Sequence, residues 1–167
     1  LGLPSQSDLA TTLADRGITP DPDAIWAAAE EMREAQATTL ADLLPVIYTA
    51  HQVAGAYAPD AEQAGKRSLT NAVLSLLTRV DGGALAQAQY DTADNMTQQL
   101  AALANLVRAD KGRDALQAFE AQWKDDRLVM DKWFGLQVIE SKPEDAAATA
   151  ARLTQHPAFN WKNPNRF

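Results

Sequence analysis

The sequence predicts an all-α fold in which antiparallel helix pairs stack into a bundle or an α-solenoid. Hydrophobic residues make up 46 % of the chain but aromatic residues only 7 %, so the apolar content is mostly Ala, Leu and Val. This composition favours close-packed helices over a β-sandwich, which needs more β-branched and aromatic side chains. In addition, no segment alternates apolar and polar residues as a strand does, whereas several repeat apolar residues at helical spacing.

The first two helices are predicted by their caps. Ser5 or Ser7 can cap a short helix, and Gly17 ends it. Asp21 is a favourable cap for a second helix that runs to the mid thirties, and Pro22 occupies the first helical position, where its missing N–H is harmless. The residues expected on the buried sides of these helices are Leu9, Leu13 and Ile18, then Ile25, Trp26, Ala29 and Met32.

Proline and glycine set the limits of the next two segments. An apolar stripe covers residues 40–53, and Pro45 inside it predicts a kink or a break between two helices. After a loop at 55–59, Asp60 and the Gln three residues later form a capping pair, and Asp-Gly-Gly at 81–83 ends the helix that they open. The expected core residues are Leu40, Leu43, Leu44 and Ile47, then Leu69, Val73, Leu76 and Leu77.

The stretch 90–107 combines an acidic, polar lead-in with a strongly amphipathic helix, which a short segment at 84–90 precedes. Asn95 can cap this helix with its side-chain oxygen, and Gln98 can reach back to the backbone N–H of the cap residue. The helix should reach about Arg108. Steps of four, three and four place one apolar stripe on its buried side, formed by Met96, Leu100, Leu103 and Val107.

Three further helices complete the chain. One covers residues 113–124, one begins at Asp126, and the last begins at a Ser-Lys-Pro-Glu capping box at 141–144 and ends near Gln155. Eight or nine helices joined by short turns predict one domain over residues 1–167, a superhelix of armadillo or HEAT type. The expected core residues here are Leu116, Phe119 and Trp123, then Leu128, Val129, Trp133, Leu136 and Val138.

Charge and composition argue against several classes of partner. The net charge is −7, with 22 acidic and 15 basic side chains, whereas nucleic acids and anionic membrane surfaces attract clustered Lys and Arg. No stretch approaches the roughly 18 uninterrupted apolar residues of a membrane span, and the N-terminal residues lack a signal-peptide pattern. We therefore expect neither nucleic acid nor membrane as a partner. Because the chain has no cysteine, disulfides and thiolate metal sites are excluded.

The sequence predicts no catalytic residue and no metal ligand. His51 and His156 are the only histidines and lie far apart in the sequence, so they cannot form the paired-histidine zinc motif of a helix. His51 is expected to be packed or at the surface, and His156 to be a hydrogen-bonded loop residue. The chain also lacks a G-x-S-x-G turn and a Gly-rich phosphate loop, and its paired carboxylates suit helix starts and solvated faces.

The last twelve residues, HPAFNWKNPNRF, differ from the rest of the chain because they show no helical period. They hold two prolines, three aromatic residues, three asparagines and one arginine. Asparagine side chains stabilise irregular backbone, and an arginine on a rigid turn is well suited to meet a carboxylate. The segment is therefore either a structured turn with a binding role or a disordered tail.

Three blocks of sequence, in this order, closely resemble the C-terminal helical domain of bacterial aminopeptidase N, a family of zinc metallo-aminopeptidases of the gluzincin class. They are YDTADNMTQQLAALANLV, FEAQWKDDRLVMDKWFGLQ and HPAFNWKNPNR. GKRSLTNAVLSLL, LPSQSDLA and DPDAIWAA also look like the pattern of that family, so the resemblance covers nearly the whole chain. Residues 22–54 follow it less closely, being richer in Ala and Glu.

The resemblance implies a non-catalytic cap domain, C-terminally truncated, of a larger multidomain enzyme that removes N-terminal residues from peptides. Such a domain would enclose the active-site chamber and restrict access to short peptides and unfolded ends. The family's H-E-x-x-H and G-A-M-E-N motifs belong to an earlier domain and are absent here, so zinc is expected only in the catalytic domain of the parent enzyme. The implied partners are the catalytic and other domains and the peptide substrate, and the expected location is cytoplasmic.

The resemblance also implies a role for the NPNR turn, which would face the chamber or its opening. Arg166 is expected to contact the carboxyl side of the substrate, with Asn163 and Asn165 holding the turn, so these three are the predicted substrate-binding residues. The alternative function is a stand-alone helical-repeat scaffold that binds a protein partner on a concave face.

Overall fold

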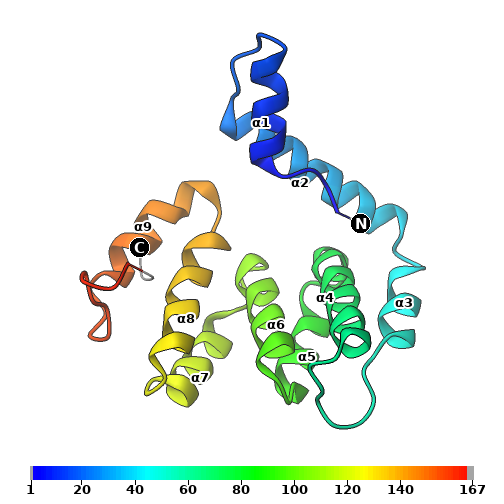
Figure 1. Ribbon diagram of the computed structural model, residues 1–167, viewed down its shortest axis with the longest axis vertical. Helices are drawn as coiled ribbons and strands as arrows, with labels where there is room; N and C mark the ends of the chain where they lie inside the picture. Colours follow the sequence, from blue (N-terminus) through cyan, green and yellow to red (C-terminus); the bar gives the residue numbers. More distant parts are fainter. Residues whose placement is uncertain (1, 165–167) are drawn as a thin grey trace.

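The computed structural model describes residues 2–164, and within that range it contains nine α-helices and no strand (Figure 1). The predicted all-α class is confirmed. The helices are α1 (Gln6–Asp15), α2 (Pro22–Thr39), α3 (Leu44–Ala50), α4 (Ala61–Asp81), α5 (Ala84–Thr92), α6 (Met96–Arg108), α7 (Arg113–Trp123), α8 (Arg127–Ile139) and α9 (Pro143–Leu153).

The helices pack in chain order as pairs, α1 with α2, α3 with α4, α5 with α6, and α7 with α8. The even-numbered helices also pack on one another in succession, α2 on α4, α4 on α6 and α6 on α8. Each pair thus buries one side against its own partner and another against the neighbouring pair, as in an α-solenoid. Figure 1 shows the pairs following an arc, with the α1–α2 hairpin at one end and α8 and α9 at the other.

Side-chain caps start most of the helices where the sequence predicted them. Ser5 and Asp8 form a full capping box at the start of α1, and Asp60 accepts a hydrogen bond from the backbone N–H of Gln63 at 2.8 Å. These side chains satisfy N–H groups that the first helical turn leaves unpaired. Asp21, Asn95 and Asp126 cap α2, α6 and α8 in the same way.

Two capping details differ from the prediction. The Gln98 side chain accepts from the amide nitrogen of Asn95 at 2.5 Å, whereas a backbone contact was expected. Ser141 does not cap α9. Its hydroxyl donates to the carbonyl of Val138 at 2.7 Å, at the end of α8, and Lys142 occupies the N-cap position without a side-chain hydrogen bond. A serine between two helices can serve either one, and here it serves the end of α8.

The core lies along the arc, where Leu74 of α4, Leu103 of α6 and Phe119 of α7 are fully buried. On α6 the most buried side chains are Gln99, Ala102, Leu103, Asn105 and Leu106, and the predicted stripe residues Met96, Leu100 and Val107 are only half-buried. The difference arises because α6 contacts α4, α5, α7 and α8. A helix covered on several sides buries a wider face than one apolar stripe.

Four residues expected on the buried sides of helices lie at the surface. Ile18, which follows α1, is 51 % exposed. Met32 of α2 is 55 % exposed, Leu43 before α3 is 50 % exposed and Leu128 in the first turn of α8 is 72 % exposed. Pro45 accompanies a full break, because α2 ends at Thr39 and α3 begins only at Leu44. Because the helix is interrupted between Thr39 and Leu44, the helical spacing does not continue from α2 into α3, and the continuous apolar stripe predicted across this region does not form.

Candidate functional site

The segment that follows α9, residues 154–164, is the irregular part of the chain that the sequence singled out. It packs against α7 and α8, although it forms no long helix of its own. Local hydrogen bonds stabilise two turns of its backbone. The N–H of Phe159 donates to the carbonyl of His156, and the N–H of Asn163 donates to the carbonyl of Asn160. The Asn160 side chain also accepts from the N–H of Lys162 at 3.0 Å. This is the role expected of asparagine in irregular backbone.

His156 joins the beginning of this segment to α7. Its Nε2 lies 2.9 Å from Oε1 of Glu120, and its Nδ1 accepts a hydrogen bond from the backbone N–H of Ala158 at 3.1 Å. Because Nδ1 accepts, the neutral ring carries its hydrogen on Nε2 and donates it to the carboxylate. His156 is therefore a hydrogen-bonded loop histidine, as predicted. Its carboxylate partner Glu120 was not predicted from the sequence.

Aromatic rings connect the middle of the segment to α8. Phe134, which is almost fully buried, meets Phe159 edge to face with ring centroids 5.6 Å apart, and Phe159 meets Trp161 at 5.1 Å. The His156 ring lies 5.3 Å from the Trp133 ring and 5.4 Å from the Phe134 ring. Edge-to-face aromatic pairs add about 0.5–1.5 kcal/mol each to the burial of their surface. The irregular segment is thus fastened by packing as well as by hydrogen bonds.

Asn163 joins the far end of the segment to α8. Its amide nitrogen donates to the carboxylate of Asp131, 3.0 Å from one oxygen and 3.2 Å from the other. Of the three predicted substrate-binding residues, Asn163 is the one that the structure describes, and Asn165 and Arg166 lie outside the described residues. A contact of any of the three with substrate stays a prediction.

The structure also brings together residues that the sequence analysis did not assign to the site. Glu120 and Asp131 lie within the block 119–137 that resembled aminopeptidase N, but on a helical wheel they look like ordinary solvent-facing acids. Both lie near the C-terminal segment only because α7 and α8 pack as a pair. The one available signal was the joint presence of this block and HPAFNWKNPNR in a single resemblance.

A groove of about 490 Å³ runs beside this segment, between α7, α8 and α9. The apolar part of its wall includes Leu116 and Trp133, and the polar part includes Gln137, Arg152 and His156. Arg152 donates to the side-chain oxygen of Gln137 at 3.2 Å. Since the indole N–H of Trp133 donates to the carbonyl of Leu116, this wall is fixed by its own hydrogen bonds.

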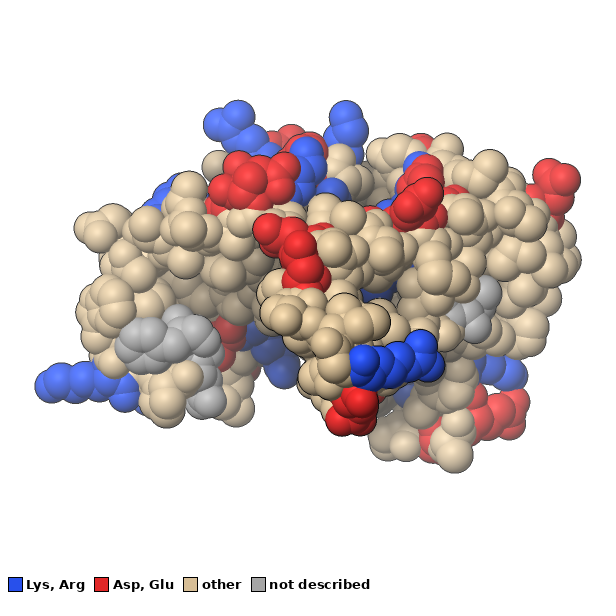
Figure 2. Space-filling view, turned by 90° about the horizontal axis from the view of Figure 1, so that it is seen from above, with Lys and Arg blue, Asp and Glu red and all other residues tan. Residues whose placement is uncertain are grey.

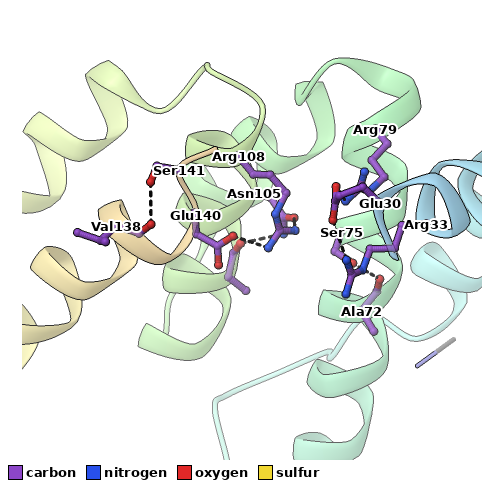
Figure 3. A network of polar contacts seen from close by, with 11 residues as sticks. Glu30, Arg33, Ala72, Ser75, Arg79, Asn105, Arg108, Val138, Glu140 and Ser141 are labelled. Carbon is purple, nitrogen blue, oxygen red and sulfur yellow. Dashed lines mark hydrogen bonds and ion pairs between the residues drawn. The ribbon is translucent and has the colours of Figure 1, made fainter. Parts of the chain in front are cut away.

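Three carboxylates in or beside the groove contact basic side chains. Glu120 contacts His156, Asp110 contacts Lys142 at 3.4 Å, and Glu140 contacts Arg108 (Figure 3). Two uncompensated carboxylates side by side would have formed a general acid–base pair. The acids described here instead contact basic side chains, which is an arrangement that stabilises structure.

A second polar cluster joins the α1–α2 hairpin to α4. Arg79 of α4 contacts Glu30 of α2 at 2.7 Å, and Arg33 also contacts Glu30 at 2.7 Å (Figure 3). Arg79 also lies 3.7 Å from Glu34. Burial raises the pKa of the Glu30 carboxyl, but the hydrogen bonds and charges of Arg79 and Arg33 outweigh burial and hold that pKa below its ordinary value. The cluster therefore keeps Glu30 ionised.

Two buried tyrosines are held in the core by hydrogen bonds. The hydroxyl of Tyr48 donates to Gln89 at 2.8 Å, and the hydroxyl of Tyr90 donates to the carbonyl of Ala115 at 2.9 Å. Burial raises the pKa of both phenols above the ordinary value. Both are therefore neutral structural donors.

The surface carries no large field of one sign on the face shown in Figure 2, where acidic and basic side chains lie in small groups among uncharged residues. Among residues 2–164, no group of three His, Asp or Glu side chains is arranged to hold a metal ion. No helix in that range is both long and apolar enough to cross a membrane.

Comparison with known proteins identifies the family. A family model described as "Domain of unknown function (DUF3458_C) ARM repeats" matches residues 1–167. The chain belongs to this family. The ARM-repeat description agrees with the helical pairs and their stacked even-numbered helices, so the predicted armadillo-like architecture is confirmed.

Three similar proteins carry the name Aminopeptidase N. The one from Caulobacter vibrioides is 35 % identical and the one from Haemophilus influenzae 38 % identical, each over 99 % of this chain. The one from Escherichia coli strain K12 is 40 % identical over 87 % of this chain. The chain spans 17–19 % of the length of these relatives and matches their C-terminal part. The resemblance stated from the sequence is confirmed.

Proposed function

We propose that this chain is the non-catalytic ARM-repeat domain of a zinc aminopeptidase, and that its helical arc covers the active-site chamber formed by other domains. The observation that carries the proposal is the similarity to three proteins named Aminopeptidase N over 87–99 % of the chain. In this role the domain restricts the enzyme to short peptides and unfolded chain ends. Its partners are the catalytic and other domains of the parent enzyme and the peptide substrate.

The hydrolytic step belongs to the other domains of the parent enzyme. There zinc would supply an activated water and a glutamate would act as general base for the removal of the N-terminal residue of a peptide. The matched region is about a fifth of each relative, which leaves room for a separate catalytic domain. Zinc is thus a cofactor of the parent enzyme and not of this chain. The location of the enzyme is proposed to be cytoplasmic.

The proposed contribution of this chain to substrate binding is the turn at 163–166. Arginine presents a planar fork of donors that matches a carboxylate or a row of peptide carbonyls. Arg166 is proposed to contact the carboxyl side of the substrate, and Asn163 and Asn165 to hold the turn. The fixed position of residues 154–164 on α7 and α8 supports this role, because a site on a rigid support is more selective than one on a loose tail.

The covering role is tested with the complete parent enzyme and with its catalytic part expressed separately. A four-residue peptide and a twenty-residue peptide with the same N-terminal residue are compared as substrates. The complete enzyme should favour the short peptide, and adding the separate 167-residue chain to the catalytic part should restore this preference. Equal preference with and without the chain would refute the covering role.

The alternative function is that of a stand-alone scaffold. It is favoured by apolar side chains exposed beside one another at α3, where Leu43 is 50 % and Val46 is 62 % exposed. Such residues serve a protein partner or another domain of the same enzyme equally well. If the open reading frame that encodes this chain has no His-Glu-x-x-His motif upstream of it, the scaffold function would be supported over the aminopeptidase domain.

A further inference from the structure

We infer that Asp131 and the Glu120–His156 pair are positioning residues, which fix residues 156–163 and so limit where the substrate-binding residues proposed at the end of the chain can lie. The inference rests on the proposed function, because it concerns the same residues. It goes beyond it by naming residues on α7 and α8 that do not touch substrate. It also gives the Asn163 side chain a specific task, which is to anchor the turn to α8.

The contact between Asn163 and Asp131 has the geometry of an anchor. One amide nitrogen donates to both carboxylate oxygens, at 3.0 and 3.2 Å. Asp131 lies on the second turn of α8, a helix that buries Met130, Trp133 and Phe134 on either side of it in sequence. The acceptor is therefore held on a rigid element. A hydrogen bond to an ionised acceptor is also stronger than one between neutral groups.

The Glu120–His156 pair fixes the other end of the same segment. The imidazole accepts from the N–H of Ala158 and donates to Glu120, so both ring nitrogens are used and the ring has one orientation. Glu120 comes from α7 and Asp131 from α8. The segment is thus held at two points, seven residues apart, by both helices of one pair.

Aromatic packing between these two points removes the remaining freedom. Phe159 packs on Phe134 from the core side and on Trp161 within the segment. His156 itself packs on Trp133 and Phe134. Two polar anchors with rigid rings between them define a position more narrowly than the same number of hydrogen bonds along a flexible tail, because the rings have few rotatable bonds.

The anchor at Asn163 matters for Arg166 because the chain between them is short. Three residues span at most about 11 Å even when fully extended, so the place of residue 163 limits where residue 166 can be. Misplacing a substrate-holding group by about 1 Å can lower activity about a hundredfold. Loosening the anchor should therefore weaken the binding of peptides without changing the chemistry at the zinc.

The test uses the complete parent enzyme and two substrates with the same N-terminal residue, a tetrapeptide and an aminoacyl anilide. The anilide has no peptide carboxyl side for the turn to contact. Asp131→Ala should raise KM for the tetrapeptide about tenfold, as expected for the loss of a hydrogen bond to a charged acceptor, and leave kcat within about twofold. For the anilide, kcat/KM should stay within about twofold.

Two further variants separate positioning from general damage. Asp131→Asn keeps one acceptor oxygen and should restore most of the tetrapeptide KM. Lys132→Ala, at an exposed neighbouring position of α8, should behave like the wild type with both substrates. Equal losses on both substrates for Asp131→Ala would overturn the inference, since they would mean that the change harms the fold and not the turn.

Hydrogen exchange distinguishes this inference from the proposed function. In the complete enzyme Asp131→Ala should speed amide exchange about tenfold in residues 158–164 and leave the second half of α8 unchanged. Unchanged amide exchange in residues 158–164 of Asp131→Ala would overturn the positioning role. The role would also be overturned if Arg166→Ala raised the tetrapeptide KM and Asp131→Ala did not. If exchange rises in Asp131→Ala while Arg166→Ala leaves the tetrapeptide KM unchanged, the anchor stands and the proposed substrate role of the turn fails.

Discussion

The two ends of the arc are built in opposite ways. The N-terminal end is a regular helical hairpin, yet α1 has no buried residue and α2 buries only Ile25, Ala29 and Ala37. The C-terminal end finishes in an irregular segment, yet that segment packs on α8, which buries five residues. Regular secondary structure therefore does not mean firm attachment. What holds an end of the arc is the non-local packing that it makes.

The difference lies in the kind of contact at each end. The hairpin meets α4 through the ion pairs of Arg79 with Glu30 and Glu34, and α2 buries only three apolar side chains. Partly exposed ion pairs are worth about 0–1 kcal/mol each. The C-terminal segment instead uses aromatic rings against a nearly fully buried Phe134. We therefore expect the hairpin to open first and the C-terminal segment to stay docked.

Removing the ring at the centre of the C-terminal packing should have the largest effect. Phe134 is 2 % exposed and contacts Trp133, His156 and Phe159. Phe134→Ala should lower the free energy of unfolding by about 3–5 kcal/mol, because it leaves a cavity that these rings cannot fill. Urea unfolding of the 167-residue chain measures it, and Leu128→Ala, at a 72 % exposed position of the same helix, should change it by less than about 0.5 kcal/mol.

Removing the charge that holds the hairpin should have a smaller and more local effect. Arg79→Met keeps the apolar stem of the side chain but removes its contacts with Glu30 and Glu34. Hairpin docking should lose about 1 kcal/mol, as for partly exposed ion pairs. Amide exchange should rise in α2 and stay unchanged in α6 and α8. A uniform rise in all three helices would show that the hairpin is as firmly attached as the rest of the arc.

The sequence predicted the helices because the signals for them are local. Asp21, Asn95 and Asp126 cap the helices that they were expected to cap. Burial was less predictable. Leu128 and Met32 continue apolar stripes but face solvent, since which side of a helix is covered depends on neighbours that are distant in the sequence.

The C-terminal site could be predicted only in part, for the same physical reason. An irregular, asparagine-rich segment indicated a structured turn, and the resemblance attached a role to it. Its partners Glu120 and Asp131 lie 36 and 32 residues away from His156 and Asn163 along the chain. No local pattern distinguishes these two acids from solvated ones. The pairing of α7 with α8 brings them to the segment.

Two matched caps give a direct comparison of the two ends. Asp21 and Asp126 accept from two backbone N–H groups each, at 3.0 and 3.2 Å in α2 and at 3.0 and 3.1 Å in α8. Replacing either by Ala weakens its helix by about 1 kcal/mol. Asp126→Ala should lower the free energy of global unfolding by that amount. Asp21→Ala should instead speed amide exchange in the first turn of α2 and change global unfolding by less than half as much, and equal global effects would contradict the comparison.

Lowering the pH should weaken the attachment of the α1–α2 hairpin by protonating Glu30. This is the smallest of the predicted effects. The pKa of Glu30 is held below the ordinary carboxyl value of about 4.3. A depressed pKa means that the stabilisation is fully present above the ordinary value and is lost as the pH falls through the lower, folded-state value. Amide exchange in α2, measured from pH 6 downwards and corrected for the intrinsic rate, should therefore begin to rise relative to α6 below about pH 4.3.

The matched variant for this acid effect is Glu30→Gln, which keeps an acceptor oxygen but cannot ionise. At pH 6 its hairpin should exchange faster than that of the wild type, because the charges of Arg79 and Arg33 have lost their partner. As the wild-type carboxylate takes up its proton, the two proteins should converge. If the difference persists at the lowest pH where the chain stays folded, Glu30 is still ionised there and its attachment to Arg79 is stronger than that of a partly exposed ion pair. The hairpin would then be fastened by charge as firmly as the opposite end is by its rings.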